Sequence, residues 1–131
     1  MLKFANTLIT GPVLAAVLLF FPLQSWSQDM PEGVTWEVVA VYAVDDPDID
    51  RVELGKFSME PGASIEMPIA ATMEFCTATQ GEWTVVNHDL GTTTIYATGS
   101  RWSQKKGHKV TVSNRGDVLA VQWVYELYAT E

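Results

Sequence analysis

The sequence predicts an all-β domain, arranged as a sandwich or barrel of short strands. Runs rich in β-branched and aromatic residues alternate with turn residues about every ten positions, which is typical of such folds. No stretch keeps a helical hydrophobic period over three turns. The chain also lacks internal repeats, low-complexity tracts and long linkers, so one domain accounts for its globular part.

The expected strands follow one another with turns between them. The first, Thr35–Val44, is β-branched and aromatic and stops at the acidic turn Asp45–Asp50. A second turn at Glu60–Ala63 carries Pro and Gly, the residues that β-turns favour. The remaining runs are Arg51–Met59, Ser64–Ile69, Met73–Gly81, Glu82–Gly91, Thr92–Gly99, Lys109–Asn114 and Asp117–Ala129.

Alternation within the last run divides it into two faces. Because successive strand residues point to opposite sides, Gln122 and Glu126 share one face and an apolar set shares the other. We expect the apolar face to point toward the core. This face consists of Leu119, Val121, Trp123, Tyr125 and Leu127.

The first 27 residues have the layout of a secretory signal peptide. Lys3 supplies a positive charge, Leu8–Leu23 is almost wholly apolar, and Ser25 and Ser27 precede a cleavage point before Gln28. The alternative is a membrane anchor, but the run is shorter than the roughly 20 residues of a full span and contains two prolines.

Cleavage would leave a single mature domain, residues 28–131. We expect this domain in the periplasm or outside the cell, with no membrane contact after cleavage. The full chain has a formal charge of -8, and loss of Lys3 makes the mature domain more acidic still. Nucleic acids and anionic membrane surfaces require clustered Lys and Arg, so neither is an expected partner.

A single cysteine, Cys76, excludes an internal disulfide. A lone thiol in an oxidising compartment is usually buried and inert. The domain therefore depends on its hydrophobic core for stability.

The segment Gly62–Gly81 resembles the first motif of the cupin superfamily, G-x5-H-x-H-x3,4-E-x6-G. All the spacings are kept, with Glu74 in the glutamate position, but Pro68 and Ala70 stand where the histidines would be. The resemblance implies that the glycines form turns of the fold, and these positions do not indicate a catalytic or binding role.

The segment Gly99–Asn114 resembles the second motif, G-x5-P-x-G-x2-H-x3-N. Gly107 and Asn114 match, whereas Lys105 replaces the proline and Val110 the histidine. The resemblance spans about Glu53–Tyr128 and implies a small antiparallel double-stranded β-helix, or jelly-roll barrel. It also implies a possible homodimer.

The resemblance implies that Pro68, Ala70, Glu74 and Val110 occupy the positions that bind one divalent ion in metal-containing cupins. Proline, alanine and valine side chains cannot coordinate a metal, and one carboxylate does not hold a transition ion alone. We therefore expect neither the usual metal site nor another cofactor.

A metal site shifted along the strands is the alternative. If positions 68 and 110 point inward, alternation places Glu66 and His108 inward too, with Glu74 beside them. Two carboxylates and an imidazole are adequate ligands for iron or zinc. Otherwise, Glu66 and His108 are solvated at the end of the barrel.

The leading functional hypothesis is metal-independent binding of a small organic ligand inside the barrel. Glu74 would anchor the ligand, and Trp102, Trp123 and Tyr125 would form its walls. The aromatic residues could instead simply fill the core, as in a structural protein whose barrel is packed shut. A third hypothesis is a metal-independent isomerase or lyase with Glu74 as catalytic acid or base, since burial raises a carboxyl pKa.

Overall fold

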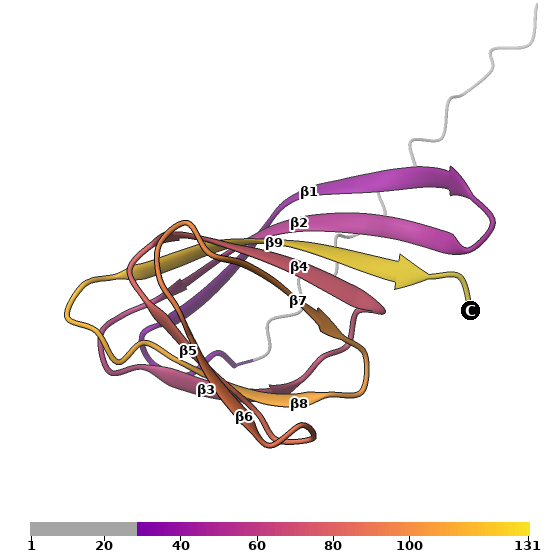
Figure 1. The fold of residues 1–131 in the computed structure, drawn as a ribbon. Coiled ribbons are helices and arrows are strands. Elements are labelled where there is room, and N and C mark those ends of the chain that lie inside the picture. Colours follow the sequence, from indigo (N-terminus) through magenta and orange to yellow (C-terminus); the bar gives the residue numbers. More distant parts are fainter. Residues whose placement is uncertain (1–28) are drawn as a thin grey trace, which may run out of the picture.

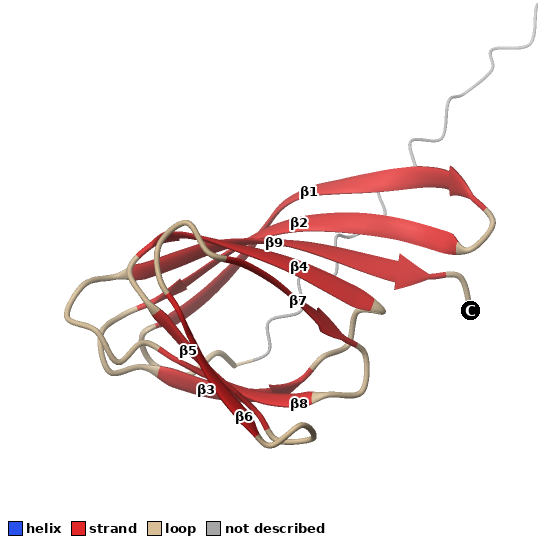
Figure 2. Cartoon of the chain, in the orientation of Figure 1, coloured by secondary structure: helices blue, strands red, loops and turns tan. Residues whose placement is uncertain are grey.

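The computed structural model describes residues 29–131, which form nine β-strands joined by turns and loops (Figure 2). The predicted signal peptide, residues 1–27, lies outside the described residues. Residues 29–131 contain no helix long and apolar enough to cross a membrane. The strands are β1 (Val34–Asp46), β2 (Ile49–Met59), β3 (Ser64–Pro68), β4 (Met73–Gln80), β5 (Trp83–Asn87), β6 (Thr92–Tyr96), β7 (Arg101–Lys105), β8 (Lys109–Ser113) and β9 (Ala120–Ala129).

The strands form two antiparallel sheets that face each other across the core (Figure 1). The first sheet has the order β1-β2-β9-β4-β7, and the second has the order β3-β8-β5-β6. Every strand pair within these sheets is antiparallel. The predicted all-β antiparallel architecture is confirmed.

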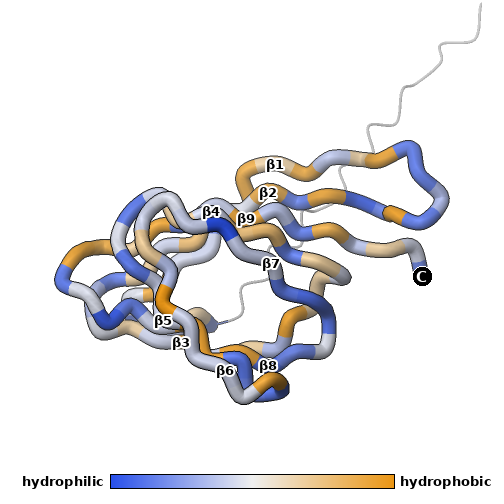
Figure 3. The backbone as a smooth tube through the Cα atoms, viewed as in Figure 1, coloured by the Kyte–Doolittle hydropathy of each residue, from blue (hydrophilic) through white to orange (hydrophobic). Residues whose placement is uncertain are grey.

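The two sheets differ in length. β1 has 13 residues and β2 has 11, whereas each strand of the second sheet has 5. The β1–β2 hairpin and the end of β9 therefore project beyond the second sheet (Figure 1). Hydrophobic segments recur along these projecting strands (Figure 3), and Val38, Val41 and Tyr42 of β1 are each nearly half exposed.

The core lies between the inner faces of the two sheets. Trp83 and Met59 are fully buried, and the rings of Phe57 and Trp83 stack across the gap with centroids 5.5 Å apart. From the second sheet, Val110 and Val112 pack into the same cluster. Cys76 is buried at 2% exposure, as expected for an inert thiol.

Asn114 holds the turn after β8 against the rest of the barrel. Its side-chain Nδ2 donates hydrogen bonds to the carbonyl oxygens of Met59 and Val118, each at 2.8 Å, and Oδ1 accepts one from the Gly116 amide. The residue is fully buried, so these bonds satisfy a side chain that has no access to water.

The predicted glycine turns are also confirmed. Gly62, Gly81, Gly99 and Gly107 all have φ between 69° and 90°, the region that other residues rarely adopt. At Gly81 a side chain would also collide, because a Cβ atom would lie 2.9 Å from the Ala120 backbone.

One strand is missing from the sequence prediction. β7 contains the polar residues Arg101, Ser103 and Lys105 on one face, so its hydrophobic alternation is too weak to identify it. β7 forms a strand because its backbone pairs with β4, although its own sequence does not predict a strand.

The expected orientation of the last strand is wrong. In β9, Tyr125 pairs with Phe75 and Trp123 with Thr77, so both rings point away from the core, and Tyr125 is 46% exposed. The inward face instead carries Gln122, which is 3% exposed, and Glu126. Both faces of β9 contain apolar residues, and the inward Val124 pairs in register with Gly55 and Cys76, so hydrophobicity alone does not identify the buried face.

Candidate functional site

A row of polar side chains crosses the inner face of the first sheet. Glu53 of β2 pairs in register with Glu126 of β9, Glu126 pairs with Glu74 of β4, and Glu74 pairs with Gln104 of β7. We call these four residues the polar row. Directly opposed carboxylates repel each other, so such a row costs stability and is unusual on an inward face.

The β4–β7 side of the polar row is buried. Glu74 is 8% exposed and Gln104 is 9% exposed. Burial, the charge of Glu126 and a hydrogen bond with Glu126 together raise the pKa of Glu74 to about 8. Burial also raises the pKa of Glu126. The Glu74–Glu126 pair therefore keeps a proton at neutral pH, as two close carboxyl groups in an apolar setting do.

The other end of the polar row is balanced by neighbouring groups. Arg51 Nε donates a 2.6 Å hydrogen bond to Glu53, and the guanidinium lies 3.9 Å from the centre of the Tyr128 ring. The Tyr128 hydroxyl donates to Glu126 Oε2 at 3.1 Å. The Arg51 guanidinium thus lies at the Glu53 end of the row, while the proton is retained deeper, at Glu74.

Two buried polar atoms beside Glu74 have no hydrogen-bond partner among residues 29–131. They are Gln104 Oε1 and Trp102 Nε1, on adjacent inward positions of β7. The Trp102 ring stacks on Tyr96 with centroids 4.1 Å apart, which holds it in the core and leaves its ring nitrogen unused. The core atoms Trp83 Nε1 and Gln122 Oε1 also lack partners among these residues, so what distinguishes Gln104 is its register position beside the buried Glu74.

A pocket of about 240 Å³ opens next to Gln104 at one end of the barrel. We call it the mouth pocket. Asn87 Nδ2 donates a 2.9 Å hydrogen bond to His108 Nδ1 at this place, so a neutral His108 carries its proton on Nε2. Glu74 does not line the pocket itself but lies behind Gln104 in the polar row. The lining residues are Met73, Asn87, Leu90, Ser103, Gln104, Lys105 and His108.

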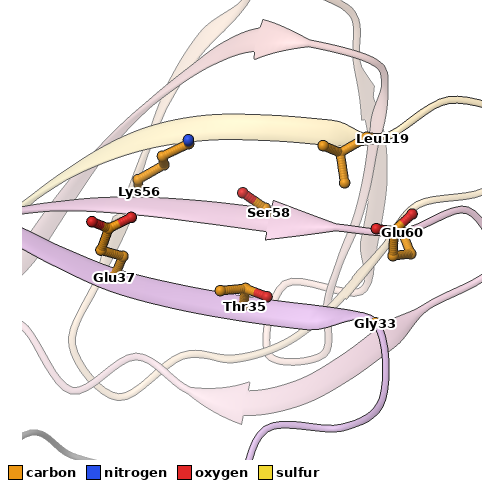
Figure 4. A pocket seen from close by; sticks show the side chains of 7 residues that line it. All are labelled: Gly33, Thr35, Glu37, Lys56, Ser58, Glu60 and Leu119. Carbon is orange, nitrogen blue, oxygen red and sulfur yellow. The ribbon is translucent and has the colours of Figure 1, made fainter.

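A larger pocket of about 340 Å³ lies on the outer face of β1, β2 and the start of β9 (Figure 4). Two of its three charged side chains, Glu37 and Lys56, are register partners and lie side by side. It is a polar surface depression, separated from the polar row by the sheet itself.

Of the four predicted ligand-binding residues, the structure brings two together. Glu74 and Trp102 both point inward from adjacent strands. Trp123 and Tyr125 lie on the opposite face of the sheet, so the expectation that they line the barrel beside Glu74 is wrong. The alternation of β9 contained Glu126, the true neighbour of Glu74, but on the face expected to be outward.

The shifted metal site is also wrong, because its three residues do not converge. Glu66 pairs in register with Thr111 on the outer face of the second sheet, 2.7 Å from Lys109 and 3.6 Å from His88. His108 belongs to the mouth pocket, and Glu74 to the polar row. Within residues 29–131, no group of three or more His, Cys, Asp or Glu side chains lies in an arrangement that could hold a metal ion.

The usual cupin metal does not fit the residues present. Pro68 and Ala70 are exposed, and the neighbouring positions that fill the interior are Met67 and Ile69. Val110, in the third histidine position, is fully buried and apolar. Since none of these side chains is a ligand for a divalent transition ion, only Glu74 remains of the usual set.

Comparison with solved structures decides the architecture. The chain superposes on the Cupin_2 domain of an XRE family transcriptional regulator from Enterobacter cloacae with a TM-score of 0.61, over 76% of this chain and 100% of that one, at 11% identity. The fold is that of the cupins. No protein-family model matches the sequence, and neither does a curated protein.

Two further solved structures are similar in fold. A Rhizobium leguminosarum protein of unknown function gives a TM-score of 0.61 at 17% identity, covering 79% of this chain and 88% of that one. A Klebsiella pneumoniae protein with a double-stranded β-helix domain gives 0.56 at 17% identity, covering 75% and 74%. At these identities, the similarity concerns the fold alone.

Proposed function

We propose that the protein is an exported cupin-fold binding protein that takes a small organic ligand at the mouth pocket without a metal ion. The observation that carries the proposal is the buried polar row, in which Glu74 shares a proton with Glu126 beside an unpaired Gln104 oxygen. A sheet that needed only to pack would place apolar side chains at these positions, as the second sheet does.

The chemistry of the row favours a ligand that donates hydrogen bonds. Gln104 Oε1, the Glu126 carboxylate and the Glu74 carbonyl oxygen are all acceptors. An amine or a similar donor group would satisfy Gln104 and would lie close to the acidic pair. The mouth pocket is smaller than the roughly 300–1,000 Å³ of sites for drug-sized molecules, so the ligand is expected to be smaller than these.

A titration of the mature protein with matched sets of small primary amines and carboxylic acids tests the proposal. We expect calorimetric binding of members of the amine set, with affinity lost in Gln104→Leu and reduced in Glu74→Gln. Glu66→Gln is the matched control, since Glu66 is exposed on the other sheet. Equal binding by the Gln104→Leu variant, or binding of the acids in preference, would contradict the assignment.

A second candidate function rests on the proton that Glu74 keeps. A carboxyl with a pKa of about 8 can donate a proton at neutral pH and take one back, as a metal-independent isomerase or lyase requires. A bound ligand that exchanges a carbon-bound proton with deuterated solvent, and stops doing so in Glu74→Gln, would favour this function. Binding without exchange would favour the binding protein.

Export is part of the same proposal and rests on the sequence of residues 1–27. N-terminal sequencing of protein recovered from the periplasm or medium should begin at Gln28. Recovery of the full-length chain from the cytoplasm alone would contradict it.

A further inference from the structure

A run of basic side chains lies at the rim of the mouth pocket. Lys105, Lys106 and Lys109 occur close together in a chain whose formal charge is -8. Lys109 pairs with Glu66 at 2.7 Å, whereas Lys105 forms no ion pair within the described part of the chain. Lys105 lines the pocket together with His108, and Lys106 does not. The pocket therefore has a cationic side, which attracts a negatively charged ligand group.

Lys105 and His108 flank the turn between β7 and β8 (Figure 1). Gly107 in this turn adopts a φ of 88°, as tight turns often require. Its amide donates a 3.2 Å hydrogen bond to the Ile69 carbonyl, and the Ile69 amide donates a 2.8 Å bond to the His108 carbonyl. The two pocket residues thus project from a backbone that is anchored to the buried Ile69.

Asn87 fixes the orientation of the His108 ring. Its Oδ1 accepts hydrogen bonds from the amides of Asp89 at 3.1 Å and Leu90 at 3.0 Å, which identifies that atom as the oxygen. Nδ2 is then the group that donates to His108 Nδ1 at 2.9 Å. A neutral His108 therefore carries its proton on Nε2, on the side of the ring away from Asn87, where it is a second donor beside Lys105.

The buried end of the pocket has the opposite character. Gln104 is 9% exposed, and its acceptor atom Oε1 has no hydrogen-bond partner among residues 29–131. Its register partner is Glu74, and Glu126 follows, so acidic groups lie behind it. Met73 and Leu90 supply apolar contact area to the same pocket. One pocket thus combines an acceptor backed by acidic groups, apolar side chains and a cation.

Strand geometry separates the acceptor from the cation. Gln104 and Lys105 are neighbours in β7, so their side chains leave the strand toward opposite faces. Gln104 is buried and Lys105 is exposed. A ligand that contacts both must therefore carry its two polar groups at opposite ends of a chain, with apolar atoms between them.

We propose that the ligand of the mouth pocket is an ω-amino acid, a short chain with an amine at one end and a carboxylate at the other. This inference rests on the proposed binding function and names its ligand class. The amine donates a hydrogen bond to Gln104 Oε1, while the carboxylate pairs with Lys105 and accepts a hydrogen bond from His108 Nε2. The methylene groups between them contact Met73 and Leu90.

Other small ligands satisfy only part of this pocket. A simple amine leaves the Lys105 ammonium without a counter-ion, and a simple carboxylate leaves Gln104 Oε1 without a donor. A diamine places its second ammonium beside Lys105, which costs binding energy. An α-amino acid carries both groups on one carbon atom, so it does not reach both ends of the pocket.

Calorimetric titration of the mature protein with chains of equal length tests the ligand class. The probes are γ-aminobutyrate, n-butylamine, tetramethylenediamine and butyrate, with free glycine as the short amino acid. We expect γ-aminobutyrate to bind about tenfold more tightly than n-butylamine, because its carboxylate adds a charge-assisted hydrogen bond. Tetramethylenediamine should bind more weakly than n-butylamine, and both butyrate and glycine should bind more weakly than γ-aminobutyrate.

A pair of neighbouring lysine variants locates the carboxylate. Lys105→Met should weaken the binding of γ-aminobutyrate about tenfold and strengthen that of tetramethylenediamine, whose second ammonium then no longer meets a cation. Lys106→Met is the matched control, since it removes the same charge one residue away but does not line the pocket. It should change the affinity for γ-aminobutyrate by less than about twofold at physiological salt. Both lysines are exposed, so neither substitution should disturb the fold.

The outcomes separate this inference from the function on which it rests. If n-butylamine or glycine binds as tightly as γ-aminobutyrate, the ligand class is wrong, although a site for amines remains. Equal losses in Lys105→Met and Lys106→Met would also overturn the inference, because the effect would then come from overall charge. If none of the probes binds, the proposed function fails together with the inference.

Discussion

The two sheets of the barrel differ in the kind of side chain that they turn toward the core. The second sheet directs Trp83, Val85, Val110 and Val112 inward and leaves polar residues such as Glu66 outside. The first sheet shares this pattern near the middle of the barrel, but toward the projecting end it turns a row of acidic and amide side chains inward and a set of aromatic rings outward. The second sheet therefore has the side-chain pattern of a packing surface alone, whereas the first sheet buries polar groups that packing does not require.

Removal of the largest core side chain of the second sheet should have the largest effect. Trp83→Ala deletes a fully buried ring that stacks on Phe57, so we expect a loss of about 3–5 kcal/mol in the free energy of unfolding. Urea unfolding followed by circular dichroism measures it. Leu90→Ala, at a 62% exposed position, is the control and should change stability by less than about 0.5 kcal/mol. Equal effects would mean that the second sheet does not form the core.

The polar row should make stability depend on pH in a way that the second sheet does not. The pKa of Glu74 is about 8 when folded, against 4.5 ordinarily, so its contribution is fully present below pH 4.5 and is lost as the pH rises through 8. At about 1.4 kcal/mol per pKa unit, we expect a fall on the order of 3 kcal/mol between pH 5 and pH 9. Glu126 shifts in the same direction.

Glu74→Gln should remove most of this pH dependence, because the amide stays neutral throughout. Urea unfolding at a series of pH values compares the variant with the original chain. A variant that keeps the full slope would show that the proton resides elsewhere, and an unfolded variant would make Glu74 a structural carboxylate.

A smaller effect is expected where the two sheets are joined. Asn114→Ala removes hydrogen bonds to the Met59 and Val118 carbonyl oxygens and leaves both acceptors without their side-chain partner. We expect a loss of about 2 kcal/mol, measured by urea unfolding. No loss would mean that water replaces the side chain and that the turn after β8 is held by other contacts.

The smallest effect is expected on the outer face of the second sheet. The neighbouring Lys109 ammonium lowers the pKa of Glu66, but the side chain is 51% exposed and water screens the pair, so Glu66→Gln should leave thermal stability unchanged within error. The same substitution made at Glu74 and at Glu66 therefore contrasts the two sheets directly. A marked change at Glu66 would show that its contacts with Lys109 and His88 matter for folding.

Much of the fold could be predicted from the sequence, since glycines at turns and β-branched runs act locally. The strand pattern and the turns at Gly62, Gly81, Gly99 and Gly107 are of this kind. β7 could not be predicted in this way, because its order comes from pairing with β4.

The site was predictable only in part, and the reason lies in β9. The motif identifies Glu74 as a candidate site residue. Its neighbours in space, however, depend on the register between β4 and β9, which are far apart in the chain. The alternation of residues in β9 correctly predicts which side chains share a face. Hydrophobicity alone, however, predicts the wrong face as the inward one. The assumption that the more apolar face is always buried fails in β9, whose outer face carries Trp123 and the 46% exposed Tyr125.

One measurement tests the central claim, that the first sheet carries a protonated carboxyl at its centre. In a pH titration followed by NMR of glutamate side-chain carboxyl carbons, assigned with Glu74→Gln and Glu66→Gln, the Glu74 signal should titrate near pH 8. Glu66 should titrate below the ordinary range in the same experiment. A Glu74 signal that titrates near 4.5 would contradict the account, because the carboxyl would then be ionised at neutral pH and the polar row would be solvated.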